Sequence, residues 1–234
     1  MKPTMTDLRH ELLKVKDMPS WGRVQGDDWD RASRFIYQVK DLDTLRCETR
    51  RAASELNLPL RDFGSYVIRR WYNFHTHQVV LDIILEHASS RPESDPFHHT
   101  VDFYLDGEGF DLKLTPLPRG FGRGIDYARS HPDALARWLY VHQSQQGRFH
   151  AANRFFVVLH DATAPRQTWK LRRDFARLER TIHAFLDQPR WLEVTFEDSK
   201  GGQHRPTAGV VFCVRGCDRS SAITSVSQNP TCER

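Results

Sequence analysis

The stretch HTVDFYLDGEGFDLKLTPLP, residues 99–118, decides the fold prediction for this chain. Two runs rich in Phe, Tyr and Leu flank a glycine-containing turn, which is the pattern of a β-hairpin. If Asp106–Gly109 forms the loop, Leu105 faces Phe110 and one face of the hairpin is wholly apolar. That face belongs to a buried core. The charged side chains of the two strands gather on the opposite face: Asp102, Asp111 and Lys113.

This register places the two carboxylates close together. It pairs Tyr104 with Asp111 and Asp102 with Lys113, so the two aspartates lie on a diagonal, roughly 7 to 8 Å apart at the backbone. Mg2+ prefers carboxylate, carbonyl and water oxygens, which Asp102, Asp111 and the carbonyl of Leu112 supply. Lys113 is placed to orient or deprotonate a water and to offset charge on a phosphate. The hairpin therefore predicts a Mg2+ site, which Mn2+ also fits, for phosphodiester hydrolysis.

The pattern of Asp102 on one strand and Asp111-Leu112-Lys113 on the next resembles the core of the PD-(D/E)xK nuclease superfamily. Val101 stands where the family name has proline, and the resemblance spans about residues 61–160. It implies a restriction-endonuclease-like mixed β-sheet flanked by helices, and a metal-dependent DNA endonuclease in which Asp102, Asp111 and Lys113 are catalytic. It also implies a homodimer, because most relatives of this type that cut both strands are dimers.

A long helix is predicted from about Arg61 to His87, because its apolar residues cover more than a hundred degrees of its surface. Family members often place a further acidic residue on this helix. Gln78, Asp82 and Glu86 form a polar stripe with a spacing of four residues. Asp82 is the preferred candidate, since it interrupts an apolar run, and Gln78 is the second. The same stripe also occurs on a partly exposed helix without any catalytic role.

Other segments complete an α/β (α+β) prediction. Predicted helices cover 43–56 with Asp43 as N-cap, a segment that begins at Pro132 and ends near Gly147, and a segment from Pro165 through Phe185. The clearest buried strand is NRFFVVLH, residues 153–160, which is apolar on both faces and is expected at the centre of the sheet. Two further strands, 191–196 and 208–214, are joined across Gly201-Gly202. FIYQV, residues 35–39, fits either a short strand or a helix end.

The 234 residues are enough for one well-buried domain with an arm or tail. We expect an N-terminal helical extension (1–58), a nuclease-like core (59–215) and a disordered C-terminal tail (216–234), with residues 1–28 only loosely attached. The net charge of +4 is compatible with a polyanionic partner such as double-stranded DNA. The candidate nucleic-acid-binding residues lie after the hairpin and near the next helix end: Arg119, Arg123, Gln143, Gln146 and Arg148.

Four scattered cysteines and the absence of an apolar leader or a membrane-length apolar run predict a soluble, cytoplasmic protein. No Walker A, GxGxxG, HExxH or GxSxG motif is present. The histidines in His75-x-His77 and His98-His99 lack zinc-type spacing and are predicted to be ordinary surface or core residues.

The function that these patterns favour is a Mg2+-dependent DNA endonuclease, with restriction or phage defence as a biological role. Two alternatives stay open: a nuclease-fold module that binds nucleic acid without catalysis, and an RNA-directed nuclease or toxin. A purely structural interpretation also exists, in which Asp102 and Lys113 form an exposed ion pair on a surface ribbon.

Overall fold

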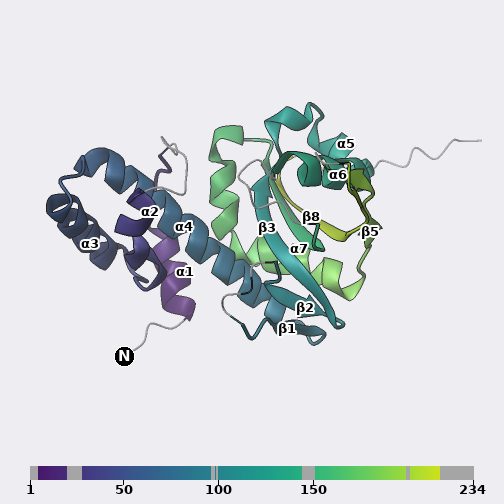
Figure 1. Cartoon of the computed structure of the whole chain (residues 1–234), viewed down its shortest axis with the longest axis horizontal. Coiled ribbons are helices and arrows are strands. Elements are labelled where there is room, and N and C mark those ends of the chain that lie inside the picture. Colours follow the sequence, from purple (N-terminus) through teal and green to yellow (C-terminus); the bar gives the residue numbers. More distant parts are fainter. Residues whose placement is uncertain are drawn as a thin grey trace, which may run out of the picture.

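The computed structural model describes residues 5–19, 28–95, 98, 100–143, 151–198 and 201–216. Figure 1 shows a helical part, which contains the N-terminal elements, beside a part built around a β-sheet. The long helix α4 (Leu60–Leu85) runs from the first part into the second. The predicted long helix is therefore confirmed, with its ends shifted by one or two residues. Among the described helices, none has the length and apolar character needed to span a membrane.

The main sheet has six strands in the order β1-β2-β3-β4-β8-β5. The strands are β1 (Ser90–Pro92), β2 (Phe103–Leu105), β3 (Glu108–Pro116), β4 (Arg154–Asp161), β5 (Leu192–Glu193) and β8 (Thr207–Arg215). The three central strands β3, β4 and β8 are parallel, whereas β1, β2 and β5 join the sheet in antiparallel pairs. The predicted mixed sheet is confirmed, and β4 lies at its centre as expected.

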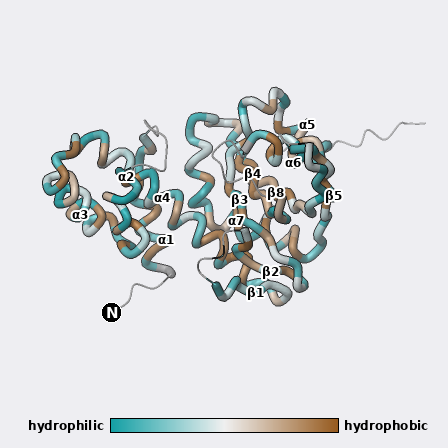
Figure 2. The backbone as a smooth tube through the Cα atoms, in the orientation of Figure 1, coloured by the Kyte–Doolittle hydropathy of each residue, from teal (hydrophilic) through white to brown (hydrophobic). Residues whose placement is uncertain are grey.

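Helices cover both faces of this sheet. Phe155, Val157 and Leu159 of β4 pack into a core with α4 and α7 (Phe175–Asp187), whereas Phe156 and Val158 face α6 (Pro132–Gln143). Since successive side chains of a strand point to opposite faces, a central strand must be apolar at every position. Figure 2 shows hydrophobic residues concentrated along the strands of this sheet.

The C-terminal half departs from the predicted element bounds. The helix expected from Pro165 is a 3-10 helix, η3 (Pro165–Arg173), followed by α7 after a break at Asp174. The strand expected over 191–196 is split into β5 and β6 (Phe196–Glu197), and β6 pairs with β7 (Gln203–His204) in a separate hairpin. Gly201 in this turn has a φ of +82°, which favours glycine.

The N-terminal elements are α1 (Met5–Leu13), α2 (Asp28–Ala32), η1 (Arg34–Tyr37) and α3 (Leu42–Glu55). The prediction of a loosely attached start is wrong for α1 and the residues just after it, because Leu8, Leu12 and Val15 are buried in the main core. The N-cap of α3 is Asp41 rather than Asp43, since the Asp41 carboxylate accepts a hydrogen bond from the Thr44 N–H at 2.8 Å. The ambiguous segment 35–39 is largely η1.

His75 of α4 makes stability depend on pH. Its side chain is buried, and Nε2 lies 2.9 Å from the carbonyl oxygens of both Ile36 and Val39. Burial lowers the pKa of His75, so the folded chain binds a proton less readily than the unfolded chain, whose histidines have a pKa of about 6.5. Stability that is present above about pH 6.5 is therefore lost as the pH falls. We expect urea denaturation to show this fall, and His75→Gln to make it shallower. An unchanged pH slope in this variant would exclude His75 as the cause.

Candidate active site

The turn of the β2–β3 hairpin sets the geometry of the candidate site. Asp106 and Gly107 have φ values of +49° and +89°, and Leu105 pairs with Glu108, so the loop has two residues. The predicted four-residue loop is wrong, because Asp-Gly is a preferred pair for a two-residue turn that needs positive φ at both positions. Phe103 consequently faces Phe110. This shift by two residues keeps the side chains of Phe103, Tyr104 and Leu105 on their predicted faces but changes their cross-strand partners.

Asp102 is tied to both sequence neighbours of Asp111. Its N–H donates to the Phe110 carbonyl at 2.8 Å, and its Oδ2 accepts from the Leu112 N–H at 2.7 Å. The two aspartates therefore lie level with each other across the strand pair, and not on the predicted diagonal.

Two basic side chains surround the Asp111 carboxylate, which is buried with 5% of the residue exposed. Lys113 Nζ lies 2.5 Å from Asp111 Oδ1, and Arg154 Nε lies 3.4 Å from Asp111 Oδ2. Arg154 belongs to β4 and is the register partner of Asp111 in the parallel pair, so the pairing of β3 with β4 places it next to Asp111. Lys113 thus pairs with the buried Asp111, rather than with Asp102 in the exposed ion pair of the structural interpretation.

His77 is the residue of α4 that reaches the hairpin. Its Nε2 lies 3.2 Å from the Leu112 carbonyl oxygen and 3.8 Å from Asp102 Oδ2. Burial lowers the pKa of His77, and the nearby Asp102 carboxylate opposes that shift. The prediction of an ordinary histidine missed this placement. The only signal in the sequence is that His77 directly precedes Gln78, the first residue of the predicted polar stripe.

Asp82 and Glu86 face other elements. Burial and the Glu86 carboxylate raise the pKa of Asp82, while the charges of Arg9 and Lys40 lower it, so its cationic neighbours belong to the N-terminal part. Glu86 lies 3.9 Å from both Arg9 and His183. Five residues of helix separate Asp82 from His77, which is a rotation of about 140°. The structure therefore brings His77, and not the preferred candidate Asp82, to the hairpin.

Side chains also cover the edge of β3 beyond the end of β2. Asp102 accepts from the Leu112 N–H, His77 lies against the Leu112 carbonyl, and Arg172 of η3 donates to the Leu114 carbonyl at 2.6 Å. Burial lowers the pKa of Arg172 to about 10. Three ionisable side chains thus cover this edge, and Asp102 and His77 are held at Leu112, the residue after Asp111.

The predicted nucleic-acid-binding residues are only partly described. Arg119 begins the short η2 helix (Arg119–Phe121) and is exposed, as is Arg123. Gln143 ends α6, and its side chain lies outside the described residues, together with Gln146 and Arg148. The predicted helix end at Gly147 and the predicted disordered tail beyond Gly216 lie outside them as well.

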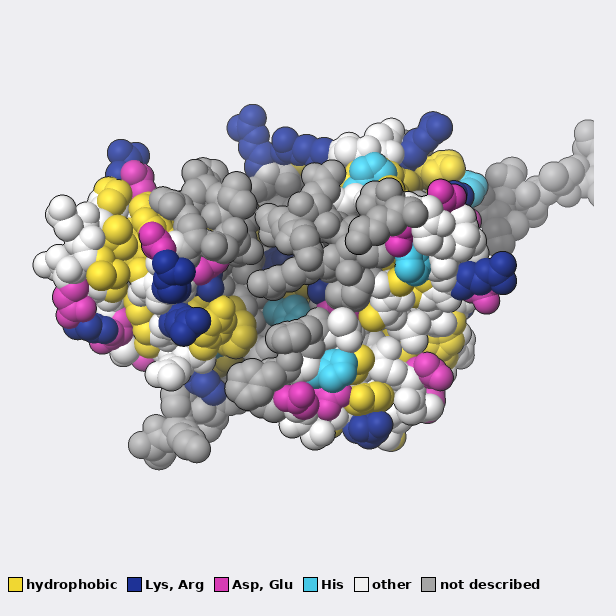
Figure 3. All heavy atoms as spheres, viewed as in Figure 1, with side chains coloured by type: hydrophobic (Ala, Val, Ile, Leu, Met, Phe, Trp, Pro, Cys, Tyr) yellow, Lys and Arg dark blue, Asp and Glu magenta, His cyan; other side chains and the backbone are white. Residues whose placement is uncertain are grey.

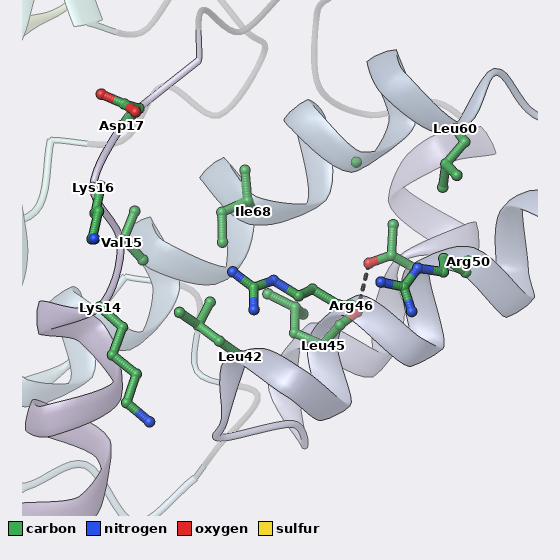
Figure 4. Close-up of a pocket in the computed structure, with 12 residues that line it drawn as sticks. Lys14, Val15, Lys16, Asp17, Leu42, Leu45, Arg46, Arg50, Leu60 and Ile68 are labelled. Atoms are coloured by element: carbon green, nitrogen blue, oxygen red, sulfur yellow. Dashed lines mark hydrogen bonds between the residues drawn. The ribbon is translucent and has the colours of Figure 1, made fainter.

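A cavity of about 650 Å3 lies elsewhere, between the segment after α1 and the helices α3 and α4 (Figure 4). Its walls combine apolar residues with four basic ones: Lys14, Lys16, Arg46 and Arg50. None of its lining residues belongs to the hairpin. The cavity and the carboxylate cluster are separate features.

The donor set at the hairpin fits a hard dication. Mg2+ commonly takes one or two carboxylates and completes its shell with carbonyl and water oxygens. Asp102 is held at the edge of β3 by the Leu112 N–H, the Leu112 carbonyl lies at the same edge, and Asp111 is the preceding residue of the strand. Across the described ranges, no three His, Cys, Asp or Glu side chains converge as a metal-ligand group. The fit therefore depends on the pair of carboxylates and the backbone carbonyl.

The chain was also compared with known proteins. No family model, curated protein or solved structure matches it.

Proposed function

We propose that this protein is a metal-dependent DNA endonuclease that hydrolyses phosphodiester bonds. The observation that carries the proposal is the hydrogen bond that holds Asp102 to Leu112, the residue after Asp111, together with Lys113 and Arg154 at the Asp111 carboxylate. Like charges across a strand pair are destabilising unless cations offset them. A fold that keeps both carboxylates here, one of them buried, is suited to holding a cation.

Each residue of the cluster has a chemical role in this proposal. Asp102, Asp111 and the Leu112 carbonyl would hold Mg2+ or Mn2+, which when bound lowers the pKa of a water and offsets charge on a phosphate. Lys113 holds an ammonium group beside Asp111, where it donates to a phosphate oxygen or positions a water. His77 lies against the Leu112 carbonyl and orients that segment of β3.

The resemblance to the PD-(D/E)xK superfamily supports the same function through the order of a long helix, Asp102 and Asp111-Leu112-Lys113. We therefore also propose that the chain belongs to that superfamily and has its restriction-endonuclease-like fold. The proposal includes a homodimer, a role in restriction or phage defence, and a cytoplasmic location. The mixed sheet flanked by helices is compatible with this fold.

Cleavage of supercoiled plasmid tests the proposal. We expect nicked or linear product in Mg2+ or Mn2+ and none in EDTA, because the two carboxylates need a cation to act. Asp102→Asn should abolish cleavage, since it removes the charge and keeps the shape. Asp106→Asn is the matched control: Asp106 is exposed in the turn, and Asn tolerates its positive φ. Equal cleavage by wild type and Asp102→Asn would overturn the proposed site.

A second candidate function is a module that binds nucleic acid without cutting it. It is favoured by the pairing of Asp111 with both Lys113 and Arg154, which already offsets its charge. A Mn2+ titration separates the two candidates, because a module of this kind should show no binding that Asp102→Asn removes. Parallel assays with structured RNA test the RNA-directed alternative.

A further inference from the structure

Five rings form a continuous strip across η2, α5 (Ile125–Ser130) and α6, which we call the aromatic strip. Its members are Phe121, Tyr127, His131, Trp138 and His142. The centroid of Phe121 lies 6.2 Å from those of both Tyr127 and Trp138. His131 stacks on Tyr127 and His142 stacks on Trp138, each with 4.2 Å between ring centroids. The strip therefore consists of two stacked pairs, with the rings nearly parallel within each pair, and Phe121 lies between the two pairs.

The two histidines are the outer rings of the strip and are exposed. Their interplanar angles to Tyr127 and Trp138 are 12° and 7°. His131 Nδ1 lies 3.2 Å from the Tyr127 carbonyl oxygen and His142 Nδ1 lies 2.9 Å from that of Trp138, which fixes both ring orientations. Each stacked pair thus presents a pre-oriented aromatic face to solvent.

The charge around the strip is positive. The segment 119–142 contains four arginines against two aspartates: Arg119, Arg123, Arg129 and Arg137 against Asp126 and Asp133. All six are exposed, and the Arg123 guanidinium lies 5.2 Å from the Tyr127 ring centroid. Figure 3 shows histidine and hydrophobic side chains near basic ones over α5 and α6. Exposed rings interleaved with arginines suit a ligand that carries both flat bases and phosphates.

The strip is connected to the candidate active site through α6. Tyr140 of this helix lies under the Arg154 guanidinium, 4.8 Å from it, and Arg154 contacts Asp111. The chain also passes directly from the end of β3 at Pro116 into η2, which begins the strip. The strip and the Asp111 cluster are therefore held by the same elements.

We propose that the aromatic strip binds unpaired bases of a single-stranded nucleic acid segment, which it holds beside the hairpin. Bases of duplex DNA are stacked on each other and leave no face for the histidines, whereas an unpaired base stacks on any aromatic ring. This inference rests on the proposed nuclease function, whose substrate it narrows to nucleic acid with an unpaired segment.

Binding in EDTA tests the strip separately from cleavage. Fluorescence anisotropy is measured with labelled oligothymidylate, a duplex of equal length, oligouridylate and an abasic strand. We expect the full-length wild-type protein to prefer the thymidylate strand over the duplex and the abasic strand. His131→Ala/His142→Ala should weaken thymidylate binding at least about tenfold, because it removes both outer rings on which bases stack. The double variant His131→Phe/His142→Phe should restore most of the affinity, since stacking needs a ring and not a charge. His10→Ala, at an exposed histidine of α1, is the matched control.

The outcomes separate this inference from the nuclease proposal. Failure of the phenylalanine variant to restore binding, or equal binding of abasic and thymidylate strands, overturns base stacking. Preference of the wild type for duplex overturns the single-stranded substrate. If strand binding depends on the rings but no cleavage occurs in Mg2+ or Mn2+, base binding by the aromatic strip is supported and the proposed nuclease function is contradicted. Comparison of the thymidylate and uridylate strands decides between DNA and RNA as the source of the segment.

Discussion

Asp111→Ala is expected to lower the free energy of unfolding by about 3–5 kcal/mol, because it leaves a buried arginine without its carboxylate. Arg154 has only 3% of its surface exposed, and its Nε lies 3.4 Å from Asp111 Oδ2. Lys113 is about one-third exposed at the side chain and can turn to solvent, but Arg154 is enclosed by Tyr140 and the neighbouring strands. The loss of stability therefore comes mainly from the buried Arg154 guanidinium, which is left without a carboxylate.

Urea denaturation of wild type, Asp111→Ala, Arg154→Met and the double variant measures this effect. The double variant should be more stable than Asp111→Ala, since it removes the buried charge along with its partner. Additive effects of the two substitutions would contradict the coupling. Loss of cleavage in Asp111→Ala alone does not separate catalysis from unfolding, so its melting must be measured beside its activity.

Lys113→Met is expected to reduce cleavage by about 10²- to 10³-fold, the range for loss of one group that stabilises developing charge. The effect on stability should be small, because the Lys113 side chain is 37% exposed and methionine retains most of its packing. The role proposed for Lys113, donation to a phosphate oxygen or a water, needs its ammonium group beside Asp111. Activity and stability are therefore expected to change independently at this position.

Single-turnover cleavage of plasmid at saturating Mg2+ measures the rate, and thermal melting checks the fold. Lys16→Met is the matched control, since Lys16 is an exposed lysine that lines the separate N-terminal cavity. A Lys113→Met rate within a few-fold of wild type would exclude Lys113 from the chemistry, even if Asp102→Asn is inactive.

Much of the fold was predictable because the signals are local. The apolar residues of α4 recur with helical spacing, and the unbroken apolar run of β4 allows only a strand that is covered on both faces. The faces of β3 were also predictable, since alternation places Asp111 and Lys113 on the face opposite Phe110 and Leu112 for any register shifted by two. These features depend on residues that are neighbours in the sequence.

The sequence by itself determined which side chains are available at the hairpin: two aspartates, one lysine and the apolar face behind them. Only the tertiary structure decided how they meet. The two-residue turn set Asp102 level with Asp111, the parallel pairing of β3 with β4 brought Arg154 to Asp111, and the rotation of α4 directed His77 to the Leu112 carbonyl. The last two contacts join residues that lie far apart in the chain, so their geometry follows from sheet pairing and helix packing, which no local pattern encodes.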